Sequence, residues 1–483
     1  MLNGLKVRNT SASFLLFIIL LAPLTYMNGA NDSSALPNLA GFPDPGGVVR
    51  TFNLNGNIDM TGPFFQSLGT NGRACSTCHQ PSDGMTVSAA HIQVRFDSSQ
   101  GLDPIFRTND GSNCDHNINV STQAGRSAAY SLLRTRGLIR VALSVPAVRD
   151  YYIASVINPY QCSETDVIST YRRPLPGANL KFLSTLMWDG RESSSQTGTI
   201  PITPGNYPAA LLSDLAHQAM DATMGHAQAL IPPTPAQQQA IVAVETGLFS
   251  AQAEGNGAGN LGAGGANGGP QPVSQQPFFG GINDPVGLDP TNPVPFHFNT
   301  SIFDIFDGWE KTGSPQRSAI ARGQALFNTR TFTITGVAGL NGTTFSNNFT
   351  GPETIVSTCG ICHDSPNAGN HSVSAPLNIG VADPPHGRNV LDTSYLPLIT
   401  ICPKNGQACV LTTDPGRALI TGNFADVGKF KGPVLRGLAA RAPYFHNGSA
   451  QSLLDVVNFY DSRFSIGFTA QEKSDLAAFL GAL

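Results

Sequence analysis

Helical spacing of apolar residues is the clearest pattern along the chain. It predicts a helix over residues 214–229, in which Leu215, Ala219 and His226 fall on neighbouring faces. The same spacing predicts two short helical pieces within residues 122–148 and single helices at 235–249 and 317–327.

Capping signals mark two further helices at the C-terminus. Ser452 with Asp455, and Thr469 with Glu472, have the spacing of a capping box, in which each side chain binds the other residue's backbone N–H. The first helix carries Leu453, Leu454, Val457 and Tyr460, and the second has the apolar face Leu476, Phe479 and Leu480.

No convincing strand ladder accompanies these helices. Charged residues make up 12% of the chain, about half the usual fraction, while apolar residues reach 41% and glycine and proline are plentiful. Disorder normally brings high charge and few apolar groups, so this balance indicates long ordered loops. The predicted fold is therefore mainly α, with long ordered loops.

A glycine-rich stretch divides the chain. Residues 251–277, beginning AQAEGNGAGNLGAGGANGGP, are either a flexible linker or a loop held against the surface, and we favour the linker. The length of 483 residues allows two or three domains, so we expect an N-terminal domain at 31–250 and a C-terminal domain at 278–483.

The first 30 residues are typical of a secretory signal peptide. Lys6 and Arg8 precede the apolar run 14–24, and Gly29 and Ala30 supply small residues for cleavage. An uncleaved membrane anchor is the alternative, but the run is interrupted by proline and shorter than the ~20 residues of a span. We expect a periplasmic protein. The net charge of -4 gives no basic footprint for nucleic acid.

Two C-x-x-C-H pentapeptides carry the chemistry. They are Cys75-Ser76-Thr77-Cys78-His79 and Cys359-Gly360-Ile361-Cys362-His363. This motif attaches haem c through two thioethers and places a histidine as proximal iron ligand. A thioredoxin-like C-x-x-C or a zinc site does not require the adjacent histidine in both copies. We therefore expect two covalently attached haem c groups.

Four cysteines lie outside these motifs. Cys402 and Cys409 flank the turn dipeptide Asn405-Gly406, which favours a bridge closing a hairpin. Cys114 and Cys162 remain as the other pair by elimination, and buried free thiols are the alternative.

Together these residues resemble the bacterial dihaem cytochrome c peroxidase family, which includes the MauG-type enzymes. The matching blocks are DGMTVSAAH ending at His91, MWDGR at 187–191, DLAHQA at 214–219, and FKGPVLRGLAARAPYFHNGSAQSLLDVVNFYD at 430–461. The resemblance implies two cytochrome-c-like domains, with a peroxidatic haem on His79 and an electron-transfer haem on His363.

The resemblance also implies further iron ligands. His91 matches the family's distal histidine at the first haem, with a surface loop histidine as the alternative. All seven methionines lie at or before Met224, so the C-terminal domain has none. Tyr460 stands at the family's axial methionine position, as in MauG-type members, and the alternative is a core aromatic residue. His446 is the main competitor; His371 and His386 are less favoured.

Other roles are implied by the same resemblance. Trp188 would relay electrons between the haems or be a core aromatic, and Arg191 would pair with a haem propionate. Family members hold a calcium ion between their domains, which here implies the carbonyls of Arg441 and Pro443.

One departure concerns the peroxide site. The family usually places a glutamate there, but no glutamate occurs between Glu192 and Glu245, where His226 and Gln228 stand. A histidine suits the proton transfer that splits the O–O bond. Alternatively, it is a surface residue in a protein that lacks peroxidase activity.

Three functions remain open. The first is a periplasmic peroxidase that reduces hydrogen peroxide with electrons from a small cytochrome c or cupredoxin. The second is a MauG-like oxidase with Tyr460 on the second iron. The third is a non-enzymatic electron-transfer cytochrome. A homodimer is common in the family, although no residue here indicates one.

Overall fold

The computed structural model describes residues 34–162, 166–385 and 389–483. It is 28% helical with 16% strand, so the expectation of a mainly α fold is wrong. The strands are short, and several pair with partners far away in sequence: β3 (Gly47–Asn53) pairs with β8 (Leu248–Gly255), and β6 (Tyr151–Ile157) with β12 (Leu398–Pro403). Such ladders depend on distant partners, so the local sequence pattern did not reveal them.

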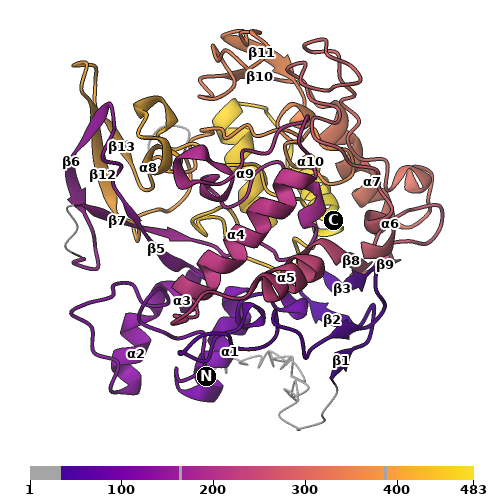
Figure 1. Cartoon of the computed structure of the whole chain (residues 1–483). Coiled ribbons are helices and arrows are strands. Elements are labelled where there is room, and N and C mark those ends of the chain that lie inside the picture. Colours follow the sequence, from indigo (N-terminus) through magenta and orange to yellow (C-terminus); the bar gives the residue numbers. More distant parts are fainter. Residues whose placement is uncertain (1–33, 163–165, 386–388) are drawn as a thin grey trace, which may run out of the picture. The chain divides into compact units, whose positions relative to one another are not determined.

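The strands of the described part form five separate sheets. Their orders are β1-β4, β2-β3-β8-β9, β5-β7, β10-β11 and β13-β12-β6, and Figure 1 shows β6, β12 and β13 side by side. The remaining strands are β1 (Ala35–Leu36), β2 (Gly41–Asp44), β4 (Ile58–Asp59), β5 (Ile139–Ser144), β7 (Val167–Arg172), β9 (Gly259–Asn260), β10 (Phe332–Thr335), β11 (Thr354–Ser357) and β13 (Val410–Thr412).

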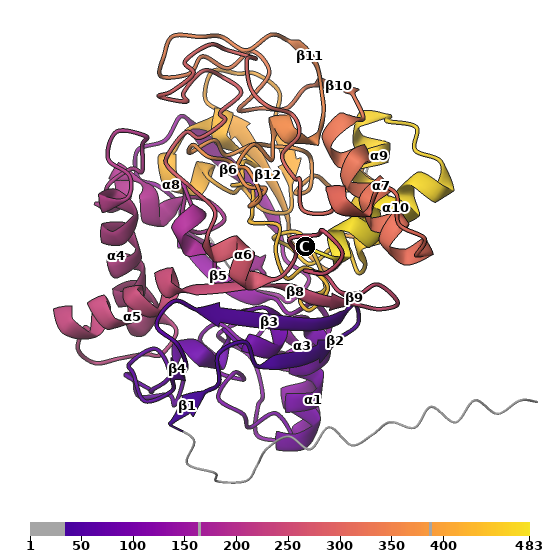
Figure 2. The same cartoon turned by 90° about the vertical axis from the view of Figure 1, so that its right-hand side faces the viewer.

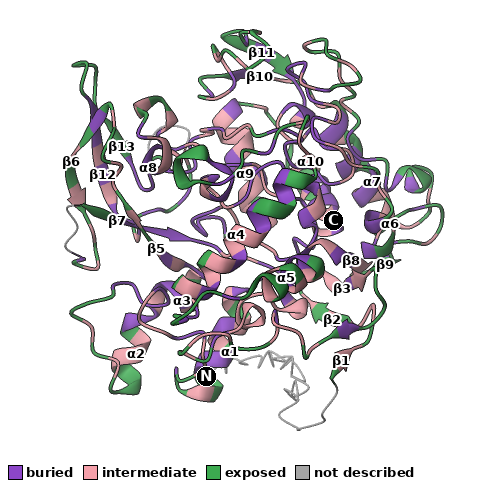
Figure 3. Ribbon diagram, in the orientation of Figure 1, coloured by how far each residue is buried: buried purple, intermediate pink, exposed green. Residues whose placement is uncertain are grey.

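The predicted helices are present, with shifted bounds. The helix predicted at 214–229 is α4, which begins earlier, at Ala209, and whose buried residues lie on one face of a partly exposed helix (Figure 3). The capping boxes at Ser452 and Thr469 both form. The helices are α1 (Ala89–Ser99), α2 (Gln123–Ala129), α3 (Ser131–Arg136), α4 (Ala209–Gly225), α5 (Pro235–Gly247), α6 (Pro270–Ser274), α7 (Pro315–Thr329), α8 (Ala418–Thr421), α9 (Leu453–Phe464) and α10 (Ala470–Gly481).

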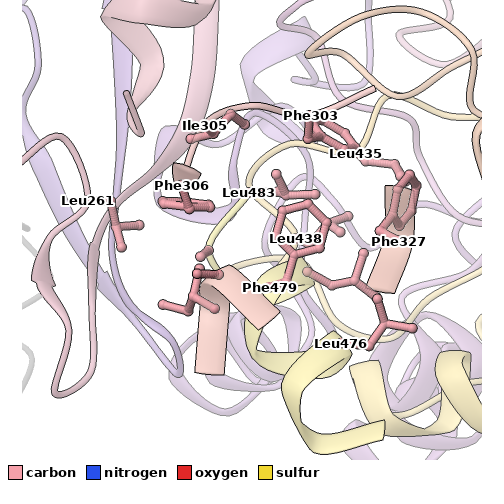
Figure 4. Close-up of a cluster of buried hydrophobic side chains, with 14 of the residues drawn as sticks. Leu261, Phe303, Ile305, Phe306, Phe327, Leu435, Leu438, Leu476, Phe479 and Leu483 are labelled. Carbon is pink, nitrogen blue, oxygen red and sulfur yellow. The ribbon is translucent and has the colours of Figure 1, made fainter. Parts of the chain in front are cut away.

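Helices α7, α9 and α10 pack together in the C-terminal half (Figure 2). Their largest apolar cluster gathers Phe303, Phe306, Phe327 and Phe479 (Figure 4), with ring centroids 5.3–6.3 Å apart in the contacting pairs. Cys359 of the second haem motif packs against the edge of this cluster. The core therefore fixes one wall around the second motif.

The glycine-rich residues 251–277 are packed rather than free. They contain the end of β8, the strand β9 and the helix α6, and Leu261 and Val273 are buried. This matches the alternative interpretation of a loop held against the rest of the chain. Residues 35–483 form one unit of mutual contacts. The division into two haem domains stays a prediction.

Both disulfides expected from the sequence are present. Cys402 joins Cys409 across the β12–β13 hairpin, and Cys114 joins Cys162. The expected signal peptide, residues 1–30, lies outside the described residues. Among the helices that the structure describes, none is both long enough and apolar enough to span a membrane.

Replacing Phe479 by alanine is expected to lower the free energy of unfolding by about 3–5 kcal/mol, because the ring is fully buried against Phe303, Phe306 and Phe327. Guanidinium unfolding followed by far-UV circular dichroism measures the loss. Leu454→Ala is the control, since Leu454 is 45% exposed and should change stability by less than about 0.5 kcal/mol. Equal losses in the two variants would contradict this packing.

Candidate active site

The first haem motif folds as a tight turn that faces a cavity. Cys75 begins a 3-10 helix, Cys75–Thr77, and its carbonyl accepts hydrogen bonds from the backbone N–H groups of Cys78 and His79. His79 Nδ1 lies 3.0 Å from the carbonyl oxygen of Met85 and donates to it, so Nε2 carries the lone pair for iron. Burial lowers the pKa of His79, which keeps the ring neutral.

The second motif repeats this arrangement. Cys359–Ile361 is a 3-10 helix, and His363 N–H donates to the Cys359 carbonyl over 3.1 Å. His363 Nδ1 donates to the Gly369 carbonyl over 2.7 Å, and burial lowers the pKa of His363 to about 4. Each motif therefore presents a neutral imidazole with Nε2 free, as an iron ligand requires.

Three hydrogen-bonded polar side chains border the cavity next to His79, which has a volume of about 180 Å³. Buried Asp110 accepts hydrogen bonds from Arg73 and from Nδ1 of His226, the residue that follows α4. Burial raises the pKa of Asp110, but the hydrogen bond and charge of His226 and the charge of Arg73 outweigh it, so this pKa lies below its usual value. All three residues line the cavity.

This arrangement gives His226 a defined role. When His226 is neutral, its lone pair resides on Nε2, because the Asp110 carboxylate accepts from Nδ1. A histidine held in this way by a carboxylate can take and return a proton as a general base and acid. Asp110 was not identified from the sequence, because it is distant from His226 along the chain and carries no local motif.

Two predicted residues lie elsewhere. His91 is on α1, where Nδ1 bonds Asp83 over 2.6 Å, and it is not among the residues lining the His79 cavity. Gln228 is exposed, and its side-chain oxygen accepts from Asn71 outside the cavity. This placement does not support iron ligation by His91 or a catalytic role for Gln228.

A glutamate does enter the cavity, from another helix. Glu245 on α5 lines it and is 6% exposed, and its Oε2 has no hydrogen-bond partner among the described residues. Burial raises the pKa of Glu245 to about 8, so the carboxyl is neutral at pH below this value. The signal in the sequence was an acid on the same helical face as Ile241, which is buried in the core.

The second cavity, about 210 Å³, is largely aromatic and apolar. Tyr460 on α9 lines it together with His363, and burial raises the pKa of Tyr460. His371 and His446 line it as well. The His446 ring stacks on Phe430 with centroids 3.8 Å apart, and within the part of the chain that the structure describes His446 Nε2 makes no hydrogen bond.

This cavity leaves the second axial ligand open between Tyr460, His371 and His446. His386 lies outside the described residues. The assignment of Tyr460 therefore stays a prediction.

The two cavities have a common wall. The residues that line both are Arg173, Pro174, Leu175, Pro176, Trp188 and Lys431. Trp188 Nε1 donates to the Arg173 carbonyl over 2.7 Å, and the Lys431 N–H donates to the Trp188 carbonyl over 2.9 Å. The indole predicted as an electron relay is thus fixed between the two cavities.

The charges around the cavities fit haem c. Among the described residues lining the second cavity are Arg173, Lys431 and Arg441 but no carboxylate. Buried cations without counter-charges are costly, and the propionates of a haem would supply those charges. With two thiols and a neutral histidine at each cavity, the residues present match what a haem c group needs.

The remaining predicted contacts are less direct. Arg191 lines the first cavity but already pairs with Asp189 over 3.1 Å, so a propionate would share it. The Arg441 carbonyl accepts from Arg173 Nη2 over 3.0 Å. Pro443 lines the second cavity. Calcium binding by these two carbonyls stays a prediction.

The chain is similar to cytochrome-c peroxidases, as the motifs indicated, and these relatives are oxidoreductases. The cytochrome-c peroxidase IdrP1 of Denitromonas iodatirespirans is 31% identical over 199 residues, which are 37% of this chain and 44% of the relative. IdrP2 of the same organism is 33% identical over 137 residues, 26% and 35% of the two chains. IdrP1 of Pseudomonas sp. (strain SCT) is 44% identical over 81 residues, 14% and 21%. The chain thus spans less than half the length of each relative.

Two other comparisons are less informative. No family model matches the chain. The crystal structure of a MauG-like protein associated with microbial copper homeostasis aligns with 87% of each chain, at 15% identity and a TM-score of 0.34. A TM-score this low does not establish a shared fold.

Glu245→Gln is expected to alter how stability depends on pH. The pKa of Glu245 is about 8 in the folded protein against an ordinary 4.5, so between these values the folded state holds a proton that the unfolded chain has released. Stability therefore falls as pH rises through this window, by up to about 1.4 kcal/mol per pH unit. Urea unfolding at a series of pH values measures the slope, which should be flatter in the variant.

The matched control is Glu254→Gln, since Glu254 lies on the next element, β8, where it is partly exposed and paired with Arg50. It should keep the wild-type slope. A Glu245→Gln protein whose stability follows the wild-type pH curve would show that Glu245 is ionised in the folded state.

Proposed function

We propose that this chain is a periplasmic dihaem peroxidase. It receives electrons from a small redox protein at the His363 haem and reduces hydrogen peroxide at the His79 haem. The observation that carries the proposal is the common wall, because Trp188 borders both haem-attachment cavities. The partial similarity to cytochrome-c peroxidases supports the same reaction class.

The first cavity has the groups that peroxide reduction requires. The reaction takes H2O2, two electrons and two protons to two molecules of water. Haem bound at His79 would supply the redox-active iron. His226 Nε2 takes the proton from one peroxide oxygen and returns it to the departing oxygen, while Asp110 holds the ring in the required tautomer.

The two cavities differ in polarity, which suits different tasks. The His79 cavity has Asp110, His226 and Glu245 within reach of a polar substrate. Around His363 the lining is mainly apolar and aromatic. A dry site of low polarity is suited to electron storage and transfer, and a polar one to proton-coupled chemistry.

A MauG-like oxidase is the second candidate function. The observation that favours it is that Tyr460 and His363 line the same cavity. A tyrosinate ligand stabilises ferric iron and lowers its reduction potential, which favours high oxidation states over simple electron storage. In that case an organic or protein substrate would replace the electron donor.

Replacing His226 by alanine is expected to lower kcat/KM for hydrogen peroxide by about 10²–10⁴-fold, because the variant loses its proton-transfer group. Steady-state oxidation of a reduced small cytochrome c measures the effect, with haem content determined in parallel. His217→Ala is the control: His217 lies on α4, the helix that His226 directly follows, pairs with Glu192 and does not line the cavity. Turnover that survives in His226→Ala at the control level would exclude His226 as the proton carrier.

Tyr460→Phe separates the two candidate functions. If Tyr460 binds the second iron, the variant should change the absorption and EPR spectra of that haem and raise its reduction potential, since an anionic ligand is lost. Tyr444→Phe, which changes another tyrosine lining the same cavity, should leave the spectra unchanged. Identical spectra in wild type and Tyr460→Phe would remove the case for a MauG-like oxidase.

A further inference from the structure

Lys431 is the one charged side chain of the common wall whose charged group has no hydrogen-bond or ion-pair partner among the described residues. It is 6% exposed, and within the described residues its ammonium makes no hydrogen bond or ion pair. By contrast, the Arg173 guanidinium donates to backbone carbonyls of residues 87, 136, 137 and 441. The indole N–H of Trp188, the only donor of that side chain, already donates to the Arg173 carbonyl. An ammonium with three donors is therefore buried beside both cavities without a partner.

The backbone holds Lys431 in this place. Its N–H donates to the Trp188 carbonyl, and its neighbour Phe430 bridges with Leu377. Glycine is favoured at the next position, because a Cβ on Gly432 would lie 2.9 Å from Cδ2 of His371 and one of them would have to shift. The close approach of this segment fixes the Lys431 backbone at the wall.

The surroundings of Lys431 favour the binding of an anion. Burial and the charge of Arg441 lower the pKa of Lys431 to about 7, and no carboxylate acts on it in the opposite direction. The second cavity, as far as the described residues line it, has no acid at all. A buried ammonium becomes favourable when a carboxylate neutralises it. Haem c brings two carboxylates into each cavity, and Lys431 borders both cavities.

We propose that Lys431 is a shared counter-charge for the propionates of both haems, so that one positive charge sets the reduction potentials of both. This inference rests on the dihaem part of the proposed function and does not require peroxidase activity. The ferric state has one more positive charge than the ferrous state, so a nearby cation favours reduction. Because Lys431 borders both cavities, it raises both potentials.

The test is potentiometric titration of the holoprotein, in which each haem is followed by its absorption and EPR signals. Lys431→Met keeps the length and apolar stem but removes the charge, and both midpoint potentials should fall. Lys431→Arg keeps the positive charge, so both of its midpoint potentials should stay near the wild-type values. Lys429→Met is the control, since Lys429 already pairs with Asp426 over 3.0 Å and lines neither cavity. Unchanged potentials in Lys431→Met, or a shift at one haem only, would overturn the proposal.

If Lys431→Met loses haem, its midpoint potentials cannot be compared with those of the wild type. In that event, haem content and potentials are measured in Lys431→Arg and Lys431→Gln. The proposal expects haem retention and near wild-type potentials in the arginine variant but not in the glutamine variant. A glutamine variant with two haems at wild-type potentials would show that the charge is dispensable. Since none of these readouts involves peroxide, an inactive protein would still decide the question.

Discussion

The arrangement of the two cavities depends on one buried guanidinium. Arg172, at the end of β7, binds both oxygens of Asp414 over 2.7 and 2.9 Å and also donates to Asp189. All three side chains are almost fully buried. Burial raises the pKa of Asp189, but the charges of Arg191 and Arg172 outweigh it and hold the group ionised. Removing one partner from such a group leaves a buried charge, which typically costs about 3–5 kcal/mol.

This ion group of Arg172, Asp189 and Asp414 also fixes the residues adjacent to them in the chain. Asp189 is adjacent to Trp188, and Arg172 is adjacent to Arg173, whose carbonyl accepts the indole N–H. The ion group therefore positions both partners of that hydrogen bond. It joins the N-terminal half of the chain to the loop that contains Asp414. A stable common wall between the cavities is thus a consequence of one buried polar network.

Local signals gave correct predictions of helices, whereas long-range strand pairing was not predicted. The capping boxes and the helix at α4 depend on residues within a few positions of one another. The long-range strand pairs do not, because strands such as β3 and β8 are about 200 residues apart along the chain. The same limit applies to the site. His226 was identified within its helix, whereas its partner Asp110 and the acid Glu245 come from other segments.

The central claim is that the chain carries two haems with different tasks, of which the one on His79 reacts with peroxide. Absorption and EPR spectra of the purified protein, recorded fully oxidised and half-reduced with and without hydrogen peroxide, test this directly. The account predicts one haem signal that changes on adding peroxide to the half-reduced protein while the other supplies an electron. Two low-spin signals indifferent to peroxide in both states would contradict it and leave an electron carrier.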